Sequence, residues 1–177
     1  MNSNQTKQVL DTNVPITANR ASVLASVRIE ELYCIKSCVE AIESVVKNGG
    51  LVMDDGDDIY AEYRTHLSFK GQPGVGDRFF KWVHDHRWTF PAADRVKIHR
   101  SGTSYDEFPQ HRELETFDDS DRKFVAVANG HHQKPPILQA TDSKWWGWKD
   151  ALAEVGIDVI FLCQDAIEMK FREKNGL

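Results

Sequence analysis

The chain has 177 residues, of which 41% are hydrophobic and 28% are charged, and this composition is typical of one globular domain with a substantial core. No apolar run approaches the roughly 20 residues of a membrane-spanning helix, and the polar N-terminus is unlike a secretory signal, so we expect a cytoplasmic protein that does not contact membranes. The net charge of −5 argues against a strong non-specific nucleic-acid binder, but not against a nuclease, whose bound cations would offset a cluster of acids.

The first part of the chain predicts two strands, each followed by a helix. Residues 7–11 are expected to form a short strand, and Pro15 suits the first turn of a helix. Apolar residues recur at three- and four-residue steps from about 27 to 47, which predicts a helix with one buried stripe. The segment 51–55 is the second predicted strand, and Asp57 is expected to cap the helix that follows it.

The rest of the chain continues this alternation after a less regular segment. A helix is expected at 77–86, whereas residues 88–117 show no clear pattern. Residues 118–130 predict a helix, because acids and a serine open the segment and Asn-Gly closes it. The remaining predicted elements are a strand at 135–141, a helix at 144–156, a strand at 157–163 and a last helix at about 165–173.

Alternating strands and helices predict an α/β fold in which a parallel sheet lies between layers of helices. The apolar strands are expected to be buried on both faces. No internal repeat or second domain is evident in the sequence. We therefore interpret residues 1–177 as a single domain, with an elaborated segment at about 64–117.

Four acidic side chains are predicted to share one pocket. Asp11 ends the first strand and Asp142 directly follows the strand at 135–141, and ligands of parallel α/β sheets bind at the carboxyl ends of the strands. Glu62 lies on the helix after the second strand, and Asp121 opens the helix before Asp142's strand. Crowded carboxylates repel one another, and Mg²⁺ or Mn²⁺ would compensate because these ions prefer oxygen ligands. Two such ions can activate water and stabilise the leaving oxygen of a phosphodiester.

Each of these acids also has an ordinary structural interpretation. Asp11 and Asp142 could simply cap helices. Asp121 could complement a helix dipole, and Glu62 could be a solvated helix residue. Only the joint placement of the four side chains favours a metal site.

Four short motifs, in this order along the chain, resemble those of the PIN domain family. They are VLDTN (9–13), IYAEY (59–63), DRKFVAVA (121–128) and ILQATDSKWW (137–146). The resemblance covers the chain nearly end to end. It implies a three-layer α/β/α fold with a central parallel sheet of about five strands. It also implies a metal-dependent endonuclease that usually cleaves RNA.

The resemblance further implies roles for single residues. The catalytic and metal-binding positions would be Asp11, Glu62, Asp121 and Asp142. Thr12 and Asn13 would support the first aspartate, and Asp119 would be an additional acid or part of the helix cap. The long segment 64–117 departs from the compact toxin-type members of the family, which leaves the choice of substrate and partner open.

Positive charge is concentrated between residues 70 and 100, where seven Lys or Arg accompany three acids. A polyanion would therefore contact this stretch more readily than the acidic stretch that follows it. The candidate nucleic-acid contacts are Lys70, Arg78, Lys81 and Arg87. A solvated surface is an equally good interpretation of the same charges.

The sequence also allows expectations for the cysteines, an aromatic run and a pair of histidines. The cysteines form no CxxC pair and are expected to be buried thiols in a reducing compartment; they are Cys34, Cys38 and Cys163. The aromatic run at 145–148 could stack on bases, although a place in the core is the favoured interpretation. His131 and His132 are expected in an exposed loop.

The leading functional hypothesis is a phosphodiesterase that acts on RNA. The acids alone do not distinguish RNA from DNA, and only the family resemblance favours RNA. One alternative is a toxin-type or defence-system nuclease controlled by an antitoxin or another operon partner. Another is a non-catalytic binding scaffold, which would have no chemical need for all four acids. The resemblance also suggests a homodimer.

Overall fold

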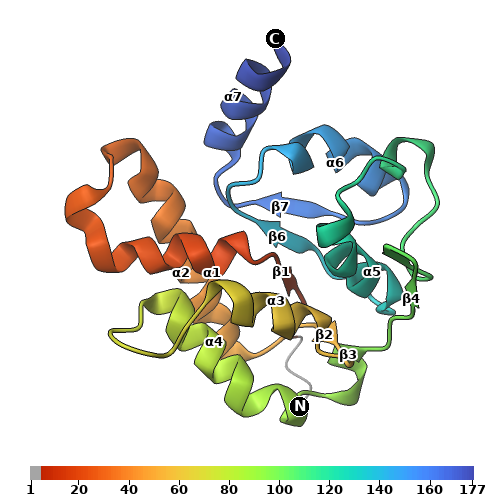
Figure 1. Ribbon diagram of the computed structural model, residues 1–177, viewed down its shortest axis with the longest axis horizontal. Coiled ribbons are helices and arrows are strands. Elements are labelled where there is room, and N and C mark those ends of the chain that lie inside the picture. The colour runs from red at the N-terminus through yellow and green to blue at the C-terminus, as the bar shows by residue number, and fades with distance from the viewer. Residues whose placement is uncertain (1–4) are drawn as a thin grey trace.

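Short parallel strands form the centre of the molecule, as Figure 1 shows for this computed structural model, which describes residues 5–177. One sheet has three parallel strands in the order β1–β6–β7. These strands are β1 (Val9–Leu10), β6 (Ile137–Gln139) and β7 (Val159–Phe161). Because the pairing is parallel, the carboxyl ends of all three strands lie at one edge of the sheet.

A second parallel pair joins β2 (Met53–Asp54) to β3 (Arg95–Val96). An isolated parallel bridge between Gln8 and Leu51 connects the chain just before β1 to the chain just before β2. The predicted mixed α/β class and parallel pairing are therefore confirmed. A central parallel sheet of about five strands is not shown, because regular pairing is interrupted between β1 and β2.

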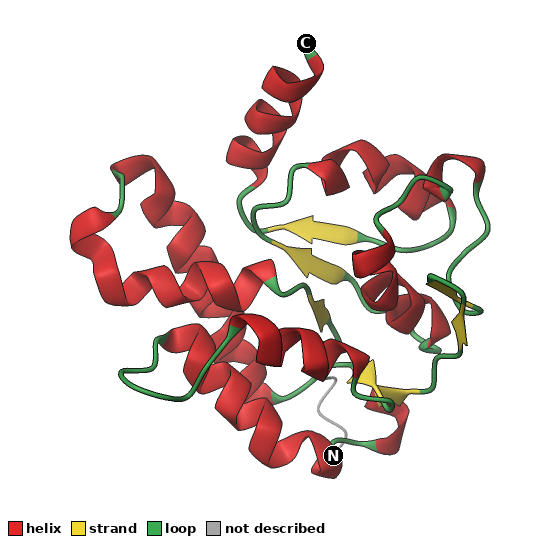
Figure 2. Ribbon diagram, viewed as in Figure 1, coloured by secondary structure: helices red, strands yellow, loops and turns green. Residues whose placement is uncertain are grey.

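Helices surround these strands (Figure 2). The longer helices are α1 (Asn13–Asn19), α2 (Ile29–Asn48), α3 (Asp58–His66), α4 (Val75–His86), α5 (Arg122–Gly130), α6 (Lys144–Glu154) and α7 (Gln164–Asn175). Helix α1 contacts both α2 and α4, whereas α5 contacts β1, β2 and β6. The predicted helices at 27–47, 77–86, 144–156 and 165–173 are confirmed within a few residues.

The segment between α3 and α5 is built from short elements. It contains α4 and β3, followed by an antiparallel hairpin of β4 (Arg100–Ser101) and β5 (Ser104–Tyr105). Short 3₁₀ turns fill the remainder, namely η2 (Arg87–Thr89), η3 (Ala92–Asp94), η4 (Arg112–Leu114) and η5 (Asp119–Asp121), and a further one, η1 (Arg20–Ser26), follows α1. Buried side chains of α4, including Phe79 and Phe80, belong to the same core cluster as those of β1 and β6.

The start of α3 differs from the prediction. The side chain of Asp57 does not cap the helix, and its backbone has a left-handed φ of 65°. The carboxylate of Asp54 instead accepts hydrogen bonds from the backbone amides of Asp58, at 2.7 Å, and Ile59, at 2.9 Å. The expectation for Asp57 is therefore wrong, because the last residue of β2 reaches back over the turn and satisfies the free amides of α3.

The expected burial of the strands on both faces is wrong for β7. In β1 and β6, Val9 and Ile137 are fully buried, but Ile160 of β7 is 46% exposed. Within residues 5–177, β7 is the last strand of its sheet, and the exposure of Ile160 shows that one face of the strand is not fully covered. An apolar run in the sequence therefore indicated a strand without indicating its position in the sheet.

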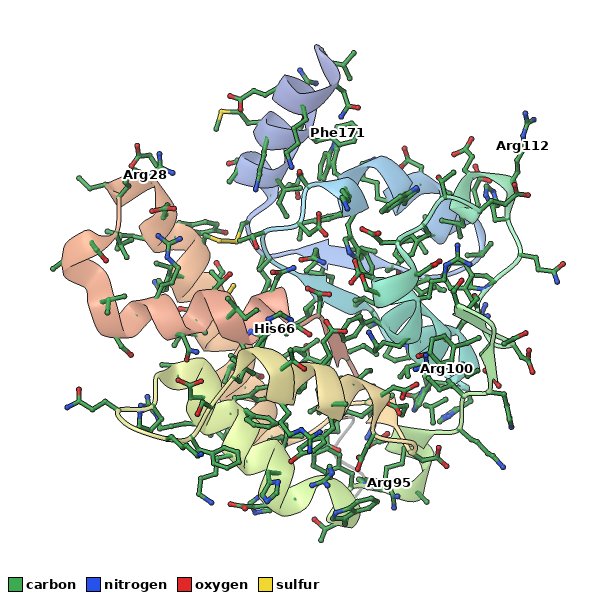
Figure 3. All side chains as sticks on the ribbon, in the orientation of Figure 1. Arg28, His66, Arg95, Arg100, Arg112 and Phe171 are labelled. Atoms are coloured by element: carbon green, nitrogen blue, oxygen red, sulfur yellow. A yellow bond between two sulfur atoms is a disulfide. The ribbon has the colours of Figure 1, made fainter. Side chains whose placement is uncertain are left out.

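The cysteines were expected to be thiols, and this is wrong for two of them. Cys34 on α2 and Cys163, just before α7, form a disulfide across a sequence separation of 129 residues, with Cα atoms 4.9 Å apart (Figure 3). Cys38 is a free, buried thiol. The cysteines therefore do not support a reducing compartment, and the cytoplasmic location stays a prediction. Within residues 5–177, no helix combines the length and apolar character required to cross a membrane.

Two other expectations concern buried side chains near the sheet. Trp145 is fully buried, which confirms a place in the core for this part of the aromatic run. His131, expected in an exposed loop, is 2% exposed, and its Nε2 lies 3.5 Å from the buried carboxylate of Asp94. Only His132 of the pair is exposed.

Candidate functional site

An open pocket of about 520 Å³ lies where β1 ends, and three of the four predicted acids line it. Asp11 directly follows β1, so the strand delivers its carboxylate to the pocket. Glu62 comes from α3, and Asp121 from the short turn η5 that leads into α5. Residues 11, 62 and 121 are far apart in sequence, and the fold brings them together.

Asp142 lies beside this pocket without lining it. Its negative charge is close enough to raise the pKa of both Asp11 and Asp121. One carboxylate oxygen, Oδ1, accepts a hydrogen bond of 3.0 Å from the backbone amide of Lys144 at the start of α6. Asp142 therefore stabilises the start of α6, and its charge also raises the pKa of Asp11 and Asp121 in the pocket.

Asp11 is the most strongly perturbed acid of the pocket. Its side chain is 2% exposed, and its Oδ1 accepts a 2.9 Å hydrogen bond from the backbone amide of Asn13. Burial, followed by the charge of Asp121, raises the pKa of Asp11 to about 8, and the hydrogen bond from Asn13 only partly opposes this. Without a bound metal ion, Asp11 is therefore held largely in its protonated form at neutral pH.

Asp121 is perturbed in the same direction. Burial raises the pKa of Asp121 to about 6, against the effect of a 3.2 Å hydrogen bond that Trp145 Nε1 donates to its Oδ2. The charges of Asp142 and Glu62 contribute to this rise in the pKa. The indole of Trp145 thus holds Asp121 in place from the protein core.

Glu62 is held by two partners. Thr12 Oγ1 donates a 2.7 Å hydrogen bond to Glu62 Oε1. The ammonium group of Lys123 contacts the other carboxylate oxygen and the carbonyl oxygen of Ser120. Lys123 was not among the predicted site residues, although it stands in the same motif as Asp121. The sequence contained one signal for a role of Lys123, which is its position two residues after Asp121 at the start of a helix.

The three residues that were predicted to support the acidic site have different contacts in the structure. Thr12 contacts Glu62, whereas Asn13 supports Asp11 through its backbone amide. Asp119 does not line the pocket and forms an ion pair with Arg122 at 3.1 Å. The structure therefore favours the helix-start interpretation of Asp119 over that of an additional acid.

None of the four predicted nucleic-acid contacts lines this pocket. Lys81 pairs with Asp85 at 2.7 Å, and Arg87 pairs with Asp57 at 3.0 Å while it lies over the ring of Tyr60. Arg78 on α4 donates to the backbone carbonyl of Pro73 in the loop before that helix, and Lys70 is exposed. The basic side chains that do line the pocket are His66, Arg100 and Lys123.

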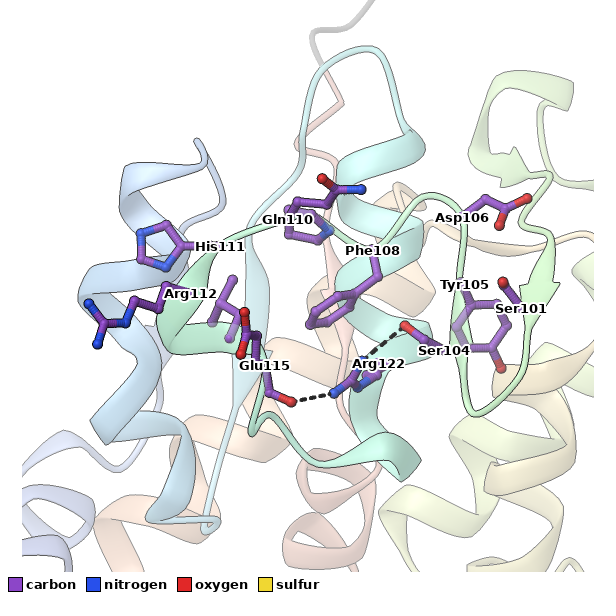
Figure 4. A pocket seen from close by; sticks show the side chains of 12 residues that line it. Ser101, Ser104, Tyr105, Asp106, Phe108, Gln110, His111, Arg112, Glu115 and Arg122 are labelled. Carbon is purple, nitrogen blue, oxygen red and sulfur yellow. Dashed lines mark hydrogen bonds between the residues drawn. The ribbon is translucent and has the colours of Figure 1, made fainter.

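A second and larger pocket, of about 670 Å³, lies beside the β4–β5 hairpin (Figure 4). Arg122 reaches into it and donates to Ser104 Oγ at 3.1 Å and to the carbonyl oxygen of Glu115 at 2.9 Å. The same guanidinium lies 4.7 Å from the ring centre of Phe108. Arg122 is thus occupied by contacts that hold the loop at 104–117, and we interpret it as part of the framework.

The donor set of the acidic pocket fits a hard divalent cation. Carboxylate oxygens are preferred ligands of Mg²⁺ and Mn²⁺, and a cation would relieve the repulsion that raises the pKa values of Asp11 and Asp121. Lys123 supplies one positive charge to offset several acids. Among residues 5–177, no three of these carboxylates have oxygens within 4.8 Å of one another, as expected for like charges that repel.

Comparisons of the chain with models of protein families, with curated proteins and with solved structures found no match. The resemblance to PIN domains therefore stays a prediction. It rests on the four sequence motifs, and the placement of Asp11, Glu62 and Asp121 around one pocket is compatible with it.

Proposed function

We propose that this protein is a metal-dependent nuclease of the PIN type that hydrolyses phosphodiester bonds. The observation that carries the proposal is the unfavourable position of Asp11. A carboxylate that is 2% exposed and surrounded by other acids destabilises the folded protein unless a cation or a proton compensates its charge. Strongly perturbed acids gathered in a pocket are typical of functional sites.

Under this proposal, Asp11, Glu62 and Asp121 hold Mg²⁺ or Mn²⁺, and Asp142 adds negative charge beside them. When bound, such ions lower the pKa of water and stabilise the leaving oxygen of a phosphodiester. Thr12 and Lys123 orient the carboxylate of Glu62, and Trp145 orients that of Asp121.

RNA is the proposed substrate, and this part rests on the family resemblance alone. Hydrolysis by metal-activated water does not require a 2′-hydroxyl group, so the acids do not distinguish RNA from DNA. Arg100 and Lys123 bring positive charge to the pocket, where Arg100 pairs with Asp58 at 3.2 Å and Lys123 pairs with Glu62. The pocket has a volume of about 520 Å³ and is open to solvent.

The proposal includes the finer architecture of that family, a three-layer α/β/α sandwich around five parallel strands in the order β3–β2–β1–β6–β7. Two features support it. The pairs β2–β3, β1–β6 and β6–β7 are all parallel, and the Gln8–Leu51 bridge has the same sense between β1 and β2.

The decisive test is cleavage of single-stranded RNA and DNA by the whole chain in Mn²⁺, Mg²⁺ or EDTA. We expect cleavage with Mn²⁺ or Mg²⁺ and none with EDTA. Asp11→Asn should reduce the rate by more than the roughly 10–100-fold that loss of an outer-shell partner costs a metal site. Asp158→Asn is the matched control, because Asp158 is exposed and lies outside the pocket. Cleavage that persists in EDTA, or in Asp11→Asn, contradicts the proposal.

One observation favours a second candidate function, a non-catalytic binding domain. The ammonium of Lys123 already contacts Glu62, so the pocket has part of the positive charge that an ion would bring. In that case Mn²⁺ would not bind at millimolar concentration, and Lys123→Met would destabilise the fold by leaving Glu62 unpaired. A calorimetric titration of the wild type with Mn²⁺ separates the two functions.

A further inference from the structure

Three sulfur atoms meet at a second place in the molecule. Cys34 and Cys38 are four residues apart on α2, so their side chains lie on one face of that helix. Cys163 comes from the other end of the chain, directly before α7. The three sulfur atoms lie within 4.8 Å of one another, and Figure 3 shows the sulfurs between α2 and the chain that leads into α7.

We propose that these three cysteines form a binding site for one thiophilic metal ion, of the class of Cu⁺, Zn²⁺ and Cd²⁺, and that the site opens only when the Cys34–Cys163 disulfide is reduced. In the oxidised state two of the three sulfurs are bonded to each other and only the Cys38 thiol remains. The disulfide and the metal site are therefore alternative states of one cluster.

The distances suit a single ion. Thiolate sulfurs bind zinc at about 2.3 Å, so sulfurs that share one ion stand roughly 4 Å apart. The three sulfurs here are already within 4.8 Å, and only the bonded pair would need to separate on reduction. Two of them are carried by one helix at a spacing of four residues, which keeps their relative position fixed in both states.

The surroundings favour soft, three-coordinate binding. Cys38 and Cys163 are buried at 0% and 3% exposure and belong to the main hydrophobic core, where water is scarce as a fourth ligand. Thiolates select soft ions over Mg²⁺ or Mn²⁺. Cys163 is the N-cap of the twelve-residue helix α7, and the positive end of that helix stabilises a thiolate there.

The redox and proton changes balance in two steps. A dithiol reductant supplies two electrons and two protons, the Cys34–Cys163 bond breaks into two thiols, and the reductant becomes a disulfide. Ion binding then displaces one proton from each of the three thiols. Burial raises the pKa of the Cys38 thiol to about 12, so without an ion this sulfur stays protonated and unreactive at neutral pH.

Such a site would tie α7 to α2 in either state. In the oxidised protein the link is the disulfide, which spans 129 residues of sequence. In the reduced protein the ion would take over the same link through the same two cysteines. The C-terminal helix would thus stay attached when the reducing conditions change.

The test is a titration of the whole chain with Cd²⁺. The protein is reduced with a phosphine, the reductant is removed without oxygen, and the ultraviolet charge-transfer band of thiolate-bound Cd²⁺ is followed. We expect one Cd²⁺ per reduced chain and no such band in the oxidised protein. Cys38→Ala should weaken binding by at least about 10-fold, while the disulfide still forms.

Two controls keep the result interpretable. The charge-transfer band reports sulfur ligands only, so Asp11→Asn, which removes a ligand of the acidic pocket, should leave it unchanged. One equivalent of Cd²⁺ should raise the melting temperature of the reduced wild type and not that of Cys38→Ala, which excludes binding to unfolded chains. If reduction unfolds the protein, one equivalent of Cd²⁺ should refold it. Equal affinity in wild type and Cys38→Ala, an equal band in the oxidised protein, or no stabilisation by Cd²⁺ overturns the proposal.

Discussion

The acidic pocket and the sulfur cluster are both groups of potential metal ligands, but they differ in almost every physical respect. The pocket is open, its candidate ligands are hard oxygens that repel, and they come from the end of β1, the middle of α3 and the turn before α5. The cluster is buried, its ligands are soft sulfurs in contact, and they join two helices. A fold can therefore hold like charges apart in an open pocket, whereas neutral sulfur groups can be packed closely in a core.

The largest expected effect concerns the cluster. Reducing the Cys34–Cys163 disulfide in the absence of metal should lower the free energy of unfolding by about 2–5 kcal/mol, because the bond closes a loop of 129 residues. Urea denaturation with and without a phosphine reductant measures this. Mn²⁺ binding at the acidic pocket should be unchanged in reduced protein that remains folded. Equal stability in both states would remove the structural role of the bond.

The next effect concerns the pH dependence of the pocket. Asp11, with a pKa of about 8, must lose its proton when an ion binds. The affinity for Mn²⁺ should therefore rise between pH 6 and pH 8, by up to about tenfold per pH unit for each proton displaced. Calorimetry in two buffers of different ionisation enthalpy gives the number of protons released. An affinity independent of pH over this range would mean that Asp11 is not a ligand. The Cd²⁺ titration of the cluster does not involve this group.

A related effect should appear in the stability of the metal-free protein. The pKa of Asp11 is raised in the folded state from 3.8 to about 8, so the folded protein keeps a proton that the unfolded chain releases. Its contribution therefore makes stability fall as pH rises from about 4 to about 8, and level off above that. Asp11→Asn should remove this slope and stabilise the protein at pH 8 by at least about 1 kcal/mol.

Denaturation in EDTA at several pH values measures how the free energy of unfolding changes with pH. Asp158→Asn again serves as the control. Removing a charge from an exposed position should leave the slope as it is in the wild type. A variant at position 11 that is less stable than the wild type at pH 8 would show that burial of the Asp11 carboxylate and the charges of the neighbouring acids do not destabilise the folded state.

The smallest effect concerns the link between the core and the pocket. Trp145→Phe keeps an aromatic ring in the core but removes the hydrogen bond from its Nε1 to Asp121. We expect a loss of about 1 kcal/mol in stability and a further rise in the pKa of Asp121, because that bond lowers it. Carboxyl titration by NMR measures the second change. An unchanged pKa at Asp121 would mean that the indole only fills space.

The sequence alone was sufficient for the order of strands and helices and for part of the pocket. Periodic apolar residues and turn residues are local signals, and they placed α2, α4, α6 and α7 to within a few residues. The rule that parallel strands present ligands at their carboxyl ends then led to Asp11, and the motifs led to Glu62 and Asp121. The same rule led to Asp142, which the structure places beside the pocket and also at the start of α6.

Only the tertiary structure decided which distant groups meet. Nothing local predicts that Lys123 contacts Glu62, that Asp54 and not Asp57 caps α3, or that the basic side chains of α4 do not line the pocket. The Cys34–Cys163 bond depends on two positions 129 residues apart becoming neighbours. Such contacts depend on how whole elements pack, and packing is set by the summed burial of many side chains and not by the pattern of any one segment.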